Sequence, residues 1–107
     1  MAPSVEEIFA WSNGSYRRAS KEYPGYYQKK INHIESLMDQ VENPYDYLGN
    51  SIRLLLNYDR MGQAKRGWEE FERLLQTKRR SIVENGVWQS IKDPIVEDFK
   101  KELGQPD

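Results

Sequence analysis

Apolar residues recur at helical spacing through most of this chain of 107 residues. In the clearest stripe, neighbouring members are four or three residues apart, so all of them lie on one side of a helix. The stripe consists of Tyr27, Ile31, Ile34, Met38 and Val41. Because Tyr23-Pro24-Gly25 interrupts the chain just before the stripe, we predict a helix from about residue 24 to residue 41 that packs against another helix.

Two pairs of an Asx residue and a proline indicate the starts of further helices. Asn43-Pro44 and Asp93-Pro94 each combine a preferred N-cap residue with a proline that is preorganised for the first helical turn. Apolar residues then follow at helical spacing. After the first pair they are Leu48, Ile52, Leu55 and Tyr58, and after the second they are Ile95, Phe99 and Leu103. We therefore predict helices that begin at residues 44 and 94.

A further stripe lies between these two helices and predicts one more. It consists of Trp68, Phe71, Leu75 and Ile82. Asn85-Gly86 is expected to end this helix, because glycine readily adopts the left-handed conformation found just after a helix. Met61-Gly62 either ends the preceding helix or forms a soft point within a longer one.

The beginning of the chain also carries a helix signal. Ser4 followed by Glu7 matches a capping box, with Ile8 and Phe9 next, and the cluster at residues 12–15 either breaks or frays this helix. No segment alternates apolar and polar residues over the length of a strand, so we predict no β-structure. The expected fold is all-α, a single domain over residues 1–107 built as a small antiparallel helical bundle of four to five helices.

Composition excludes several kinds of chemistry. The chain has no cysteine, which removes disulfides, thiolate metal sites and cysteine nucleophiles together. The longest aliphatic run, Leu54 to Leu56, is far shorter than a membrane span requires, and no secretory signal is visible at the N-terminus. We therefore expect a cytoplasmic protein with no membrane partner.

Neither a metal centre nor a catalytic site is expected. His33 is the only histidine and has no cysteine to share a metal with. An acidic run without the spacing of a calcium-binding loop is interpreted as a solvated face or a docking patch; it consists of Glu35, Asp39, Glu42 and Asp46. No nucleophile elbow and no phosphate-binding loop occurs. We predict that the protein is not an enzyme and that it binds no cofactor and no metal.

Residues 16–30 combine basic side chains with interleaved tyrosines. The basic residues are Arg17, Arg18, Lys21, Lys29 and Lys30, against a single acid, Glu22. Cations that contact phosphates and rings that stack on bases are the ingredients of single-strand binding. The whole-chain pI of about 5.9 is lower than that of a typical nucleic-acid-binding domain. A nucleic-acid-associated regulator that uses these five basic residues is therefore the alternative function.

A family resemblance supports that alternative. The stretch from Glu22 to Tyr27, continued by Ile31, Ile34 and Met38 and then by a second long helix, resembles the N-terminal helical part of phage late-gene transcription activators. The resemblance implies a regulator that continues into a helix-turn-helix-like region. The C-terminal third of this chain does not show such a region, so no residue role is carried over.

The leading interpretation is a protein-interaction or assembly module of bacterial or phage origin. Residues 35–46 carry four acids and no base, whereas residues 47–80 carry eight bases and four acids. Such segregated charge suits helices with complementary faces, within one chain or between chains. The expected partner is another protein or a second copy of the chain. The candidate contact residues are the aromatic side chains Trp11, Tyr26, Tyr45 and Trp88.

Overall fold

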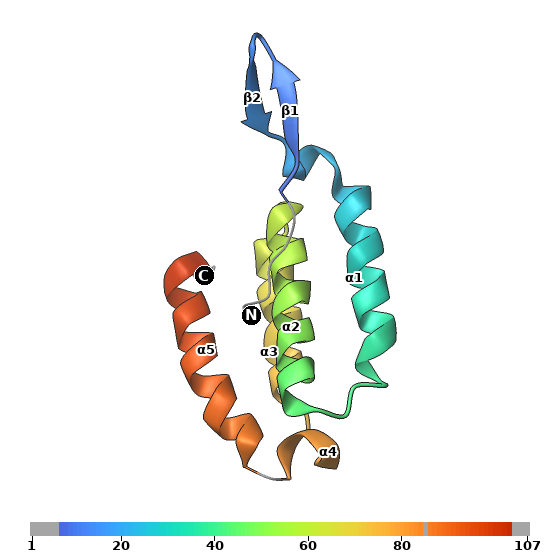
Figure 1. Ribbon diagram of the computed structural model, residues 1–107, viewed down its shortest axis with the longest axis vertical. Coiled ribbons are helices and arrows are strands. Elements are labelled where there is room, and N and C mark those ends of the chain that lie inside the picture. The colour runs from blue at the N-terminus through green and yellow to red at the C-terminus, as the bar shows by residue number, and fades with distance from the viewer. Residues whose placement is uncertain (1–6, 85, 104–107) are drawn as a thin grey trace.

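The computed structural model describes residues 7–84 and 86–103, with side chains up to residue 101. This part of the chain forms one two-stranded hairpin, one 3-10 turn and five α-helices (Figure 1). The bounds are β1 (Phe9–Ser12), β2 (Ser15–Arg18), η1 (Ser20–Glu22), α1 (Pro24–Met38), α2 (Pro44–Arg60), α3 (Ala64–Leu75), α4 (Arg80–Val83) and α5 (Val87–Leu103). The protein is therefore mainly helical, with a small antiparallel sheet.

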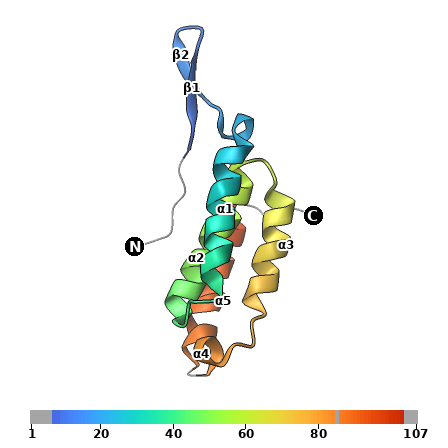
Figure 2. The same ribbon diagram turned by 90° about the vertical axis from the view of Figure 1, so that its right-hand side faces the viewer.

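Helix α2 lies at the centre of the molecule. Helices α1 and α3 pack along it, and α5 packs on a further side after the short α4 (Figures 1 and 2). The hairpin projects beyond the ends of these helices, so the molecule is elongated, with principal extents of 54 × 28 × 27 Å. This projection leaves most of the hairpin surface in solvent.

The core forms where the apolar stripes of the helices meet. Four members of the predicted stripe on α1 are buried, which confirms it: Tyr27, Ile31, Ile34 and Met38. They pack with Leu55 of α2 and Phe71 of α3, both of which are completely buried. The helix spacing read from the sequence therefore identifies the main core.

Helix α1 ends at Met38, earlier than the predicted residue 41, and a side chain from a distant segment binds carbonyl groups at this end and just after it. Arg79 Nη1 donates hydrogen bonds to the carbonyl oxygens of Met38 and Val41, each at 2.7 Å. The same guanidinium lies 5.7 Å from the ring centre of Tyr47 and 3.7 Å from a carboxylate oxygen of Asp39. Arg79 thus joins the end of α1 to the segment before α4.

The predicted start of α2 is confirmed in detail. Asn43 Oδ1 accepts hydrogen bonds from the backbone N–H groups of Tyr45 and Asp46, at 2.8 and 3.3 Å, and Pro44 occupies the first turn. At the other end, Gly62 has a φ of +84°, a left-handed conformation that glycine adopts without strain. Met61-Gly62 therefore ends α2 and is not a joint within a longer helix.

The stripe from Trp68 to Ile82 spans two helices, so the prediction of one helix was wrong. Helix α3 ends at Leu75, and the chain turns before α4, where the backbone N–H of Arg79 donates to Thr77 Oγ1 at 3.2 Å. Ile82 still enters the core, but from the short α4. The turn at residue 86, where glycine has a φ of +70°, precedes α5.

The prediction that a helix begins at Asp93-Pro94 was also wrong, because α5 runs through the proline. Trp88 precedes it and is buried against Tyr47, with ring centres 5.3 Å apart, so the first turns are held by the core. Asp93 does not cap a helix; its carboxylate accepts a hydrogen bond from Gln89 Nε2 at 2.8 Å. Pro94 leaves the carbonyl of residue 90 without a helical donor, at an exposed position that water can reach.

The largest correction concerns the N-terminal helix, because its place is taken by a hairpin. Asn13 and Gly14 have φ angles of 51° and 81°, which are typical of the two-residue type I′ turn that joins two antiparallel strands. The capping-box residue Ser4 lies outside the described residues. The helical majority is as predicted, and the fold is all-α with the addition of a small two-stranded hairpin.

Candidate functional site

The hairpin is fixed to the helices at its base by one buried serine. Ser20 Oγ accepts hydrogen bonds from the backbone N–H of Ile8 at 2.9 Å and from the hydroxyl of Tyr27 at 3.0 Å, and it donates to a carboxylate oxygen of Glu7 at 3.0 Å. The backbone N–H of Ala19 also donates to the carbonyl of Ile8 at 2.7 Å. These contacts join the segments on both sides of the hairpin to the first turn of α1.

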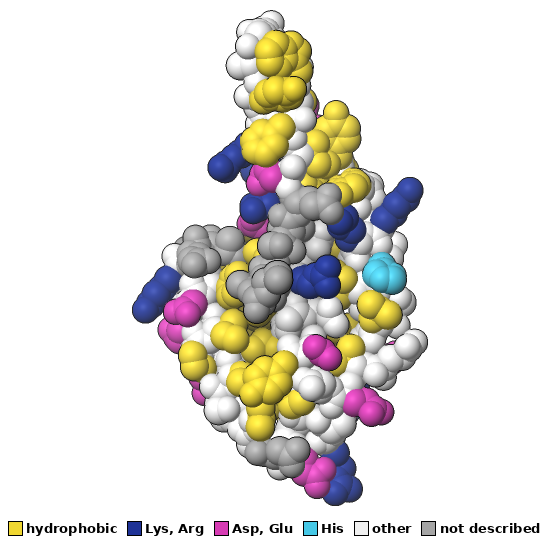
Figure 3. Space-filling view, viewed as in Figure 1, with side chains coloured by type: hydrophobic (Ala, Val, Ile, Leu, Met, Phe, Trp, Pro, Cys, Tyr) yellow, Lys and Arg dark blue, Asp and Glu magenta, His cyan; other side chains and the backbone are white. Residues whose placement is uncertain are grey.

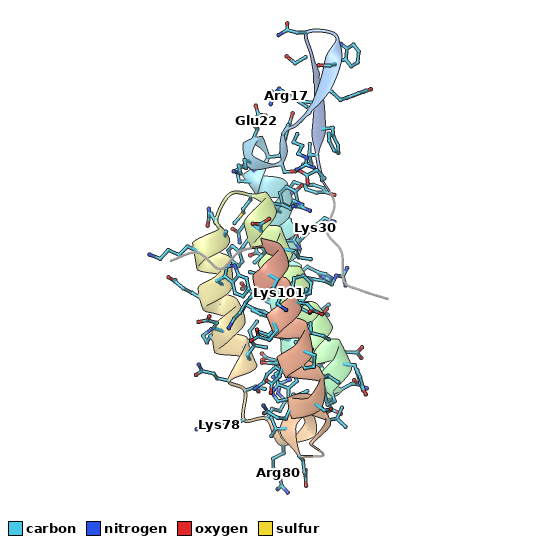
Figure 4. All side chains as sticks on the ribbon, turned by 90° about the vertical axis from the view of Figure 1, so that its left-hand side faces the viewer. Arg17, Glu22, Lys30, Lys78, Arg80 and Lys101 are labelled. Atoms are coloured by element: carbon cyan, nitrogen blue, oxygen red, sulfur yellow. The ribbon has the colours of Figure 1, made fainter. Side chains whose placement is uncertain are left out.

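Two ion pairs add to this anchorage. Glu7 also lies 3.0 Å from Arg60 Nε at the end of α2. Arg17 of β2 pairs with Glu22 of η1 through both carboxylate oxygens, and the two side chains point toward each other beside the base of the hairpin (Figure 4). The hydrogen bond from Arg17 lowers the pKa of the Glu22 carboxyl group below its ordinary value. The base of the hairpin is thus held from both strands.

The two faces of the hairpin differ sharply in composition. Strand pairing places Phe9 opposite Arg18 and Trp11 opposite Tyr16, and residues that face each other across two strands share one side of a sheet. The other side carries Ala10, Ser12, Ser15 and Arg17. We call Phe9, Trp11 and Tyr16 the aromatic face.

The aromatic face is uncovered. Phe9, Trp11 and Tyr16 are 55%, 64% and 70% exposed. Trp11 and Tyr16 contact each other edge to face, with ring centres 5.0 Å apart and planes at 75°. Figure 3 shows hydrophobic side chains along the projecting hairpin and, beside its base, at the adjoining end of the helical body. The rings therefore form a ridge rather than the wall of a pocket.

Basic side chains gather below this ridge, where the hairpin meets the helices (Figure 3). Arg18, Lys21 and Lys29 are exposed, and no ion pair to another described residue is found for them. Lys30 Nζ lies 5.0 Å from the ring centre of Tyr26. Arg18 and Lys21 also line a hollow of about 490 Å³ at the hairpin base. Arg17, by contrast, is neutralised by the carboxylate of Glu22.

The predicted protein-contact residues divide into three groups. Trp11 and Tyr26 lie at the hairpin end and are exposed, Tyr26 in the first turn of α1. Tyr45 is exposed as well, but it lies in the first turn of α2, near the opposite end of the molecule. Trp88 is 4% exposed and belongs to the core, so it offers no surface to a partner. Phe9 was missed, and Tyr16 was noted only among the tyrosines of residues 16–30, although Asn13-Gly14 between them is a hairpin signal.

The histidine and the acidic run noted in the sequence lie on α1 and around its junction with α2. Among the described residues, no group of three or more histidine and acidic side chains is placed to hold a metal ion. The predicted acidic run lies around the junction of α1 and α2, where Asp39 approaches Arg79. His33 is exposed on α1. Within the described part of the chain, none of the helices has both the length and the apolar content that a membrane crossing requires.

Comparison with known proteins gives no family assignment. No protein-family model matches the chain, and neither a curated protein nor a solved structure is significantly similar to it. The argument for function therefore rests on the residues of the hairpin end and their surroundings.

Proposed function

We propose that this protein is a non-enzymatic binding module that contacts another macromolecule through its hairpin. The helices, as a small antiparallel bundle, would serve as the scaffold, and the contacts of Ser20 and Glu7 would fix the direction in which the hairpin projects. The observation that carries the proposal is the aromatic face, which is uncovered although the base beneath it is anchored.

The size of the aromatic face supports this proposal. Three rings of roughly 200 Å² each, exposed by nearly two thirds, leave roughly 400 Å² of aromatic surface in water. Apolar patches of this size on monomers are often functional. Complete burial of this surface would contribute about 10 kcal/mol before the costs of association. The cross-strand pair of Trp11 and Tyr16 contributes only about 0.2–1 kcal/mol to the hairpin itself, so hairpin stability alone is a weak reason for the rings.

Site-specific photo-crosslinking tests whether the hairpin is the contact element. A photoreactive phenylalanine analogue would be placed at position 11 in one variant and, as a matched control, at Leu37, an exposed position at the far end of α1. Both purified proteins would be irradiated in lysate of the source organism. We expect crosslinked species from position 11 that are absent from position 37. Equal crosslinking from both positions, or none from position 11, would overturn the proposal.

The crosslinked material also identifies the class of partner. Protease-sensitive mass added to the chain would indicate another protein, and a product of twice the chain mass would indicate a second copy. Nuclease-sensitive mass would indicate a nucleic acid. Both partner classes expected from the sequence can therefore be separated in the same experiment.

A further inference from the structure

Among the described residues, the large exposed apolar side chains at the hairpin end are all aromatic. Besides the aromatic face, the large exposed apolar side chains there are Tyr23, just before α1, and Tyr26 in its first turn. The exposed aliphatic side chains Leu37 and Ile95 lie elsewhere, at the end of α1 and in α5. Exposed aromatic rings suit stacking on planar bases, and each ring can stack with one base independently.

The shape of the aromatic face favours a stacked ligand over a folded protein. Because the rings stand on a narrow projecting ribbon, they cannot form the wide, closely packed centre that a protein interface needs. Stacking requires no such centre, since each base contributes about 1–3 kcal/mol by itself.

The charge around the rings points to an anionic ligand. Arg18 lies on the same side of the hairpin as the aromatic face, and Lys21 and Lys29 lie in η1 and α1 below it. Of the acidic run, Glu35 lies six residues from Lys29 on α1, roughly 9 Å along the helix, and the other members lie at or beyond the far end of α1. The chain's net charge of −1 therefore does not describe this end, where Arg18, Lys21 and Lys29 are exposed and have no ion pair to another described residue.

We propose that the hairpin end binds single-stranded nucleic acid, with bases stacked on the aromatic face and phosphates on Arg18, Lys21 and Lys29. This inference rests on the proposed function of the hairpin and names its ligand. Stacking and phosphate contacts are both available for any base, so sequence preference is expected to be weak. A duplex should bind less tightly, because its bases already stack on one another and are not free to cover the rings.

Fluorescence anisotropy with labelled oligothymidine and oligouridine of about 20 nucleotides measures this binding directly. Three phosphate contacts predict a slope of about −2 for log affinity against log salt on a single strand. Raising the salt from about 50 to about 200 mM should then weaken binding about 20-fold. A duplex of the same length is the comparison ligand.

One single and two double variants distinguish the contributions of base stacking, phosphate contact and unspecific charge to oligonucleotide affinity. Trp11→Leu keeps an apolar side chain in the strand but removes the ring, and we expect a loss of about 5-fold or more in affinity. Arg18→Gln with Lys21→Gln should weaken binding and make the salt slope shallower by about 1.4. Lys78→Gln with Arg80→Gln removes the same charge from the opposite end of the molecule and should change affinity less than about 2-fold (Figure 4).

The outcomes distinguish this inference from the function on which it rests. The inference is overturned by absence of binding at low salt, by equal affinity for the duplex, or by equal losses in the hairpin and control charge variants. If position 11 crosslinks to protein but the chain binds no oligonucleotide, the proposed function of the hairpin stands and the inference that its ligand is a nucleic acid is wrong. Tight binding to phosphatidylserine vesicles in place of oligonucleotides would assign the end to a membrane surface instead. The charge variants keep the test valid if Trp11→Leu disturbs the hairpin.

Discussion

The anchorage of the hairpin depends on Ser20, and Ser20→Ala is the substitution that tests it. The serine side chain is 4% exposed and links three groups, the backbone of Ile8, the carboxylate of Glu7 and the hydroxyl of Tyr27. Alanine fits the same space but can neither accept nor donate a hydrogen bond. The substitution therefore removes the link without creating a clash.

The size of the effect follows from the three hydrogen bonds. Each contributes about 0.5–1.5 kcal/mol, and the buried donors that lose their acceptor add a desolvation cost. We expect a loss of about 2–4 kcal/mol, felt mainly as opening of residues 7–22 while the helices remain folded. Amide hydrogen exchange should then speed up in β1 and β2 by roughly 30-fold or more, with little change in α2.

Two companion variants make the prediction specific. Tyr27→Phe removes only the hydroxyl group. Ser20→Ala and Tyr27→Phe both delete the hydrogen bond between these two side chains, so their effects on the free energy of opening should be less than additive in the double variant. Ser36→Ala is the control, since Ser36 is an exposed serine that bonds only within its own helix turn. The reasoning is refuted if Ser20→Ala leaves exchange in the hairpin no faster than Ser36→Ala does.

Further expectations concern the helices and one titration. Gly67→Ala should lower the free energy of unfolding in urea by about 1–3 kcal/mol, because the added Cβ would lie 2.6 Å from a side-chain atom of α2. Gly49→Ala should leave it unchanged or raise it by up to about 1 kcal/mol, since the added Cβ meets open space. Equal effects of the two substitutions would contradict the packing of α2 on α3. Arg79→Gln should lower the free energy of unfolding in urea by about 2–3 kcal/mol, because two backbone carbonyl groups lose a charged hydrogen-bond donor. An unchanged urea midpoint would show that these contacts do not contribute to stability. The pKa of Glu22, followed by carboxyl NMR, should lie below its ordinary value and rise in Arg17→Gln. Because folding lowers this pKa, the ion pair makes a small contribution to folding stability above the pKa that Glu22 has in the unfolded chain. That contribution is lost as the pH falls through the pKa that Glu22 has in the folded protein.

The sequence predicted the helical core well because several local signals agree there. The stripe on α1 has helical spacing over four buried residues, and Asn43-Pro44 gives both a cap and a first turn. Pro94 misled the prediction because the sequence does not reveal that Trp88 already packs on Tyr47. Tertiary contacts of this kind hold the first turns of α5 and allow the helix to continue past the proline.

The candidate site was harder to predict because its strands are short. A four-residue strand is too brief to show clear alternation, and the capping-box match at Ser4 and Glu7 competed with the turn signal of Asn13-Gly14. Trp11 and the basic residues were identified individually. Their grouping depends on the strand register, which places Arg18 and the rings on one side, and no single-residue property reveals that arrangement.

The three tryptophans of the chain allow one direct measurement of the central claim that the hairpin end binds single-stranded nucleic acid. Trp11 is exposed on the hairpin, whereas Trp68 and Trp88 are buried in the helical body. Each indole N–H gives its own NMR signal, which can be followed while oligouridine is added. We expect the Trp11 signal to shift and saturate while the other two stay in place. An unmoved Trp11 signal, or equal shifts of all three, would contradict the claim.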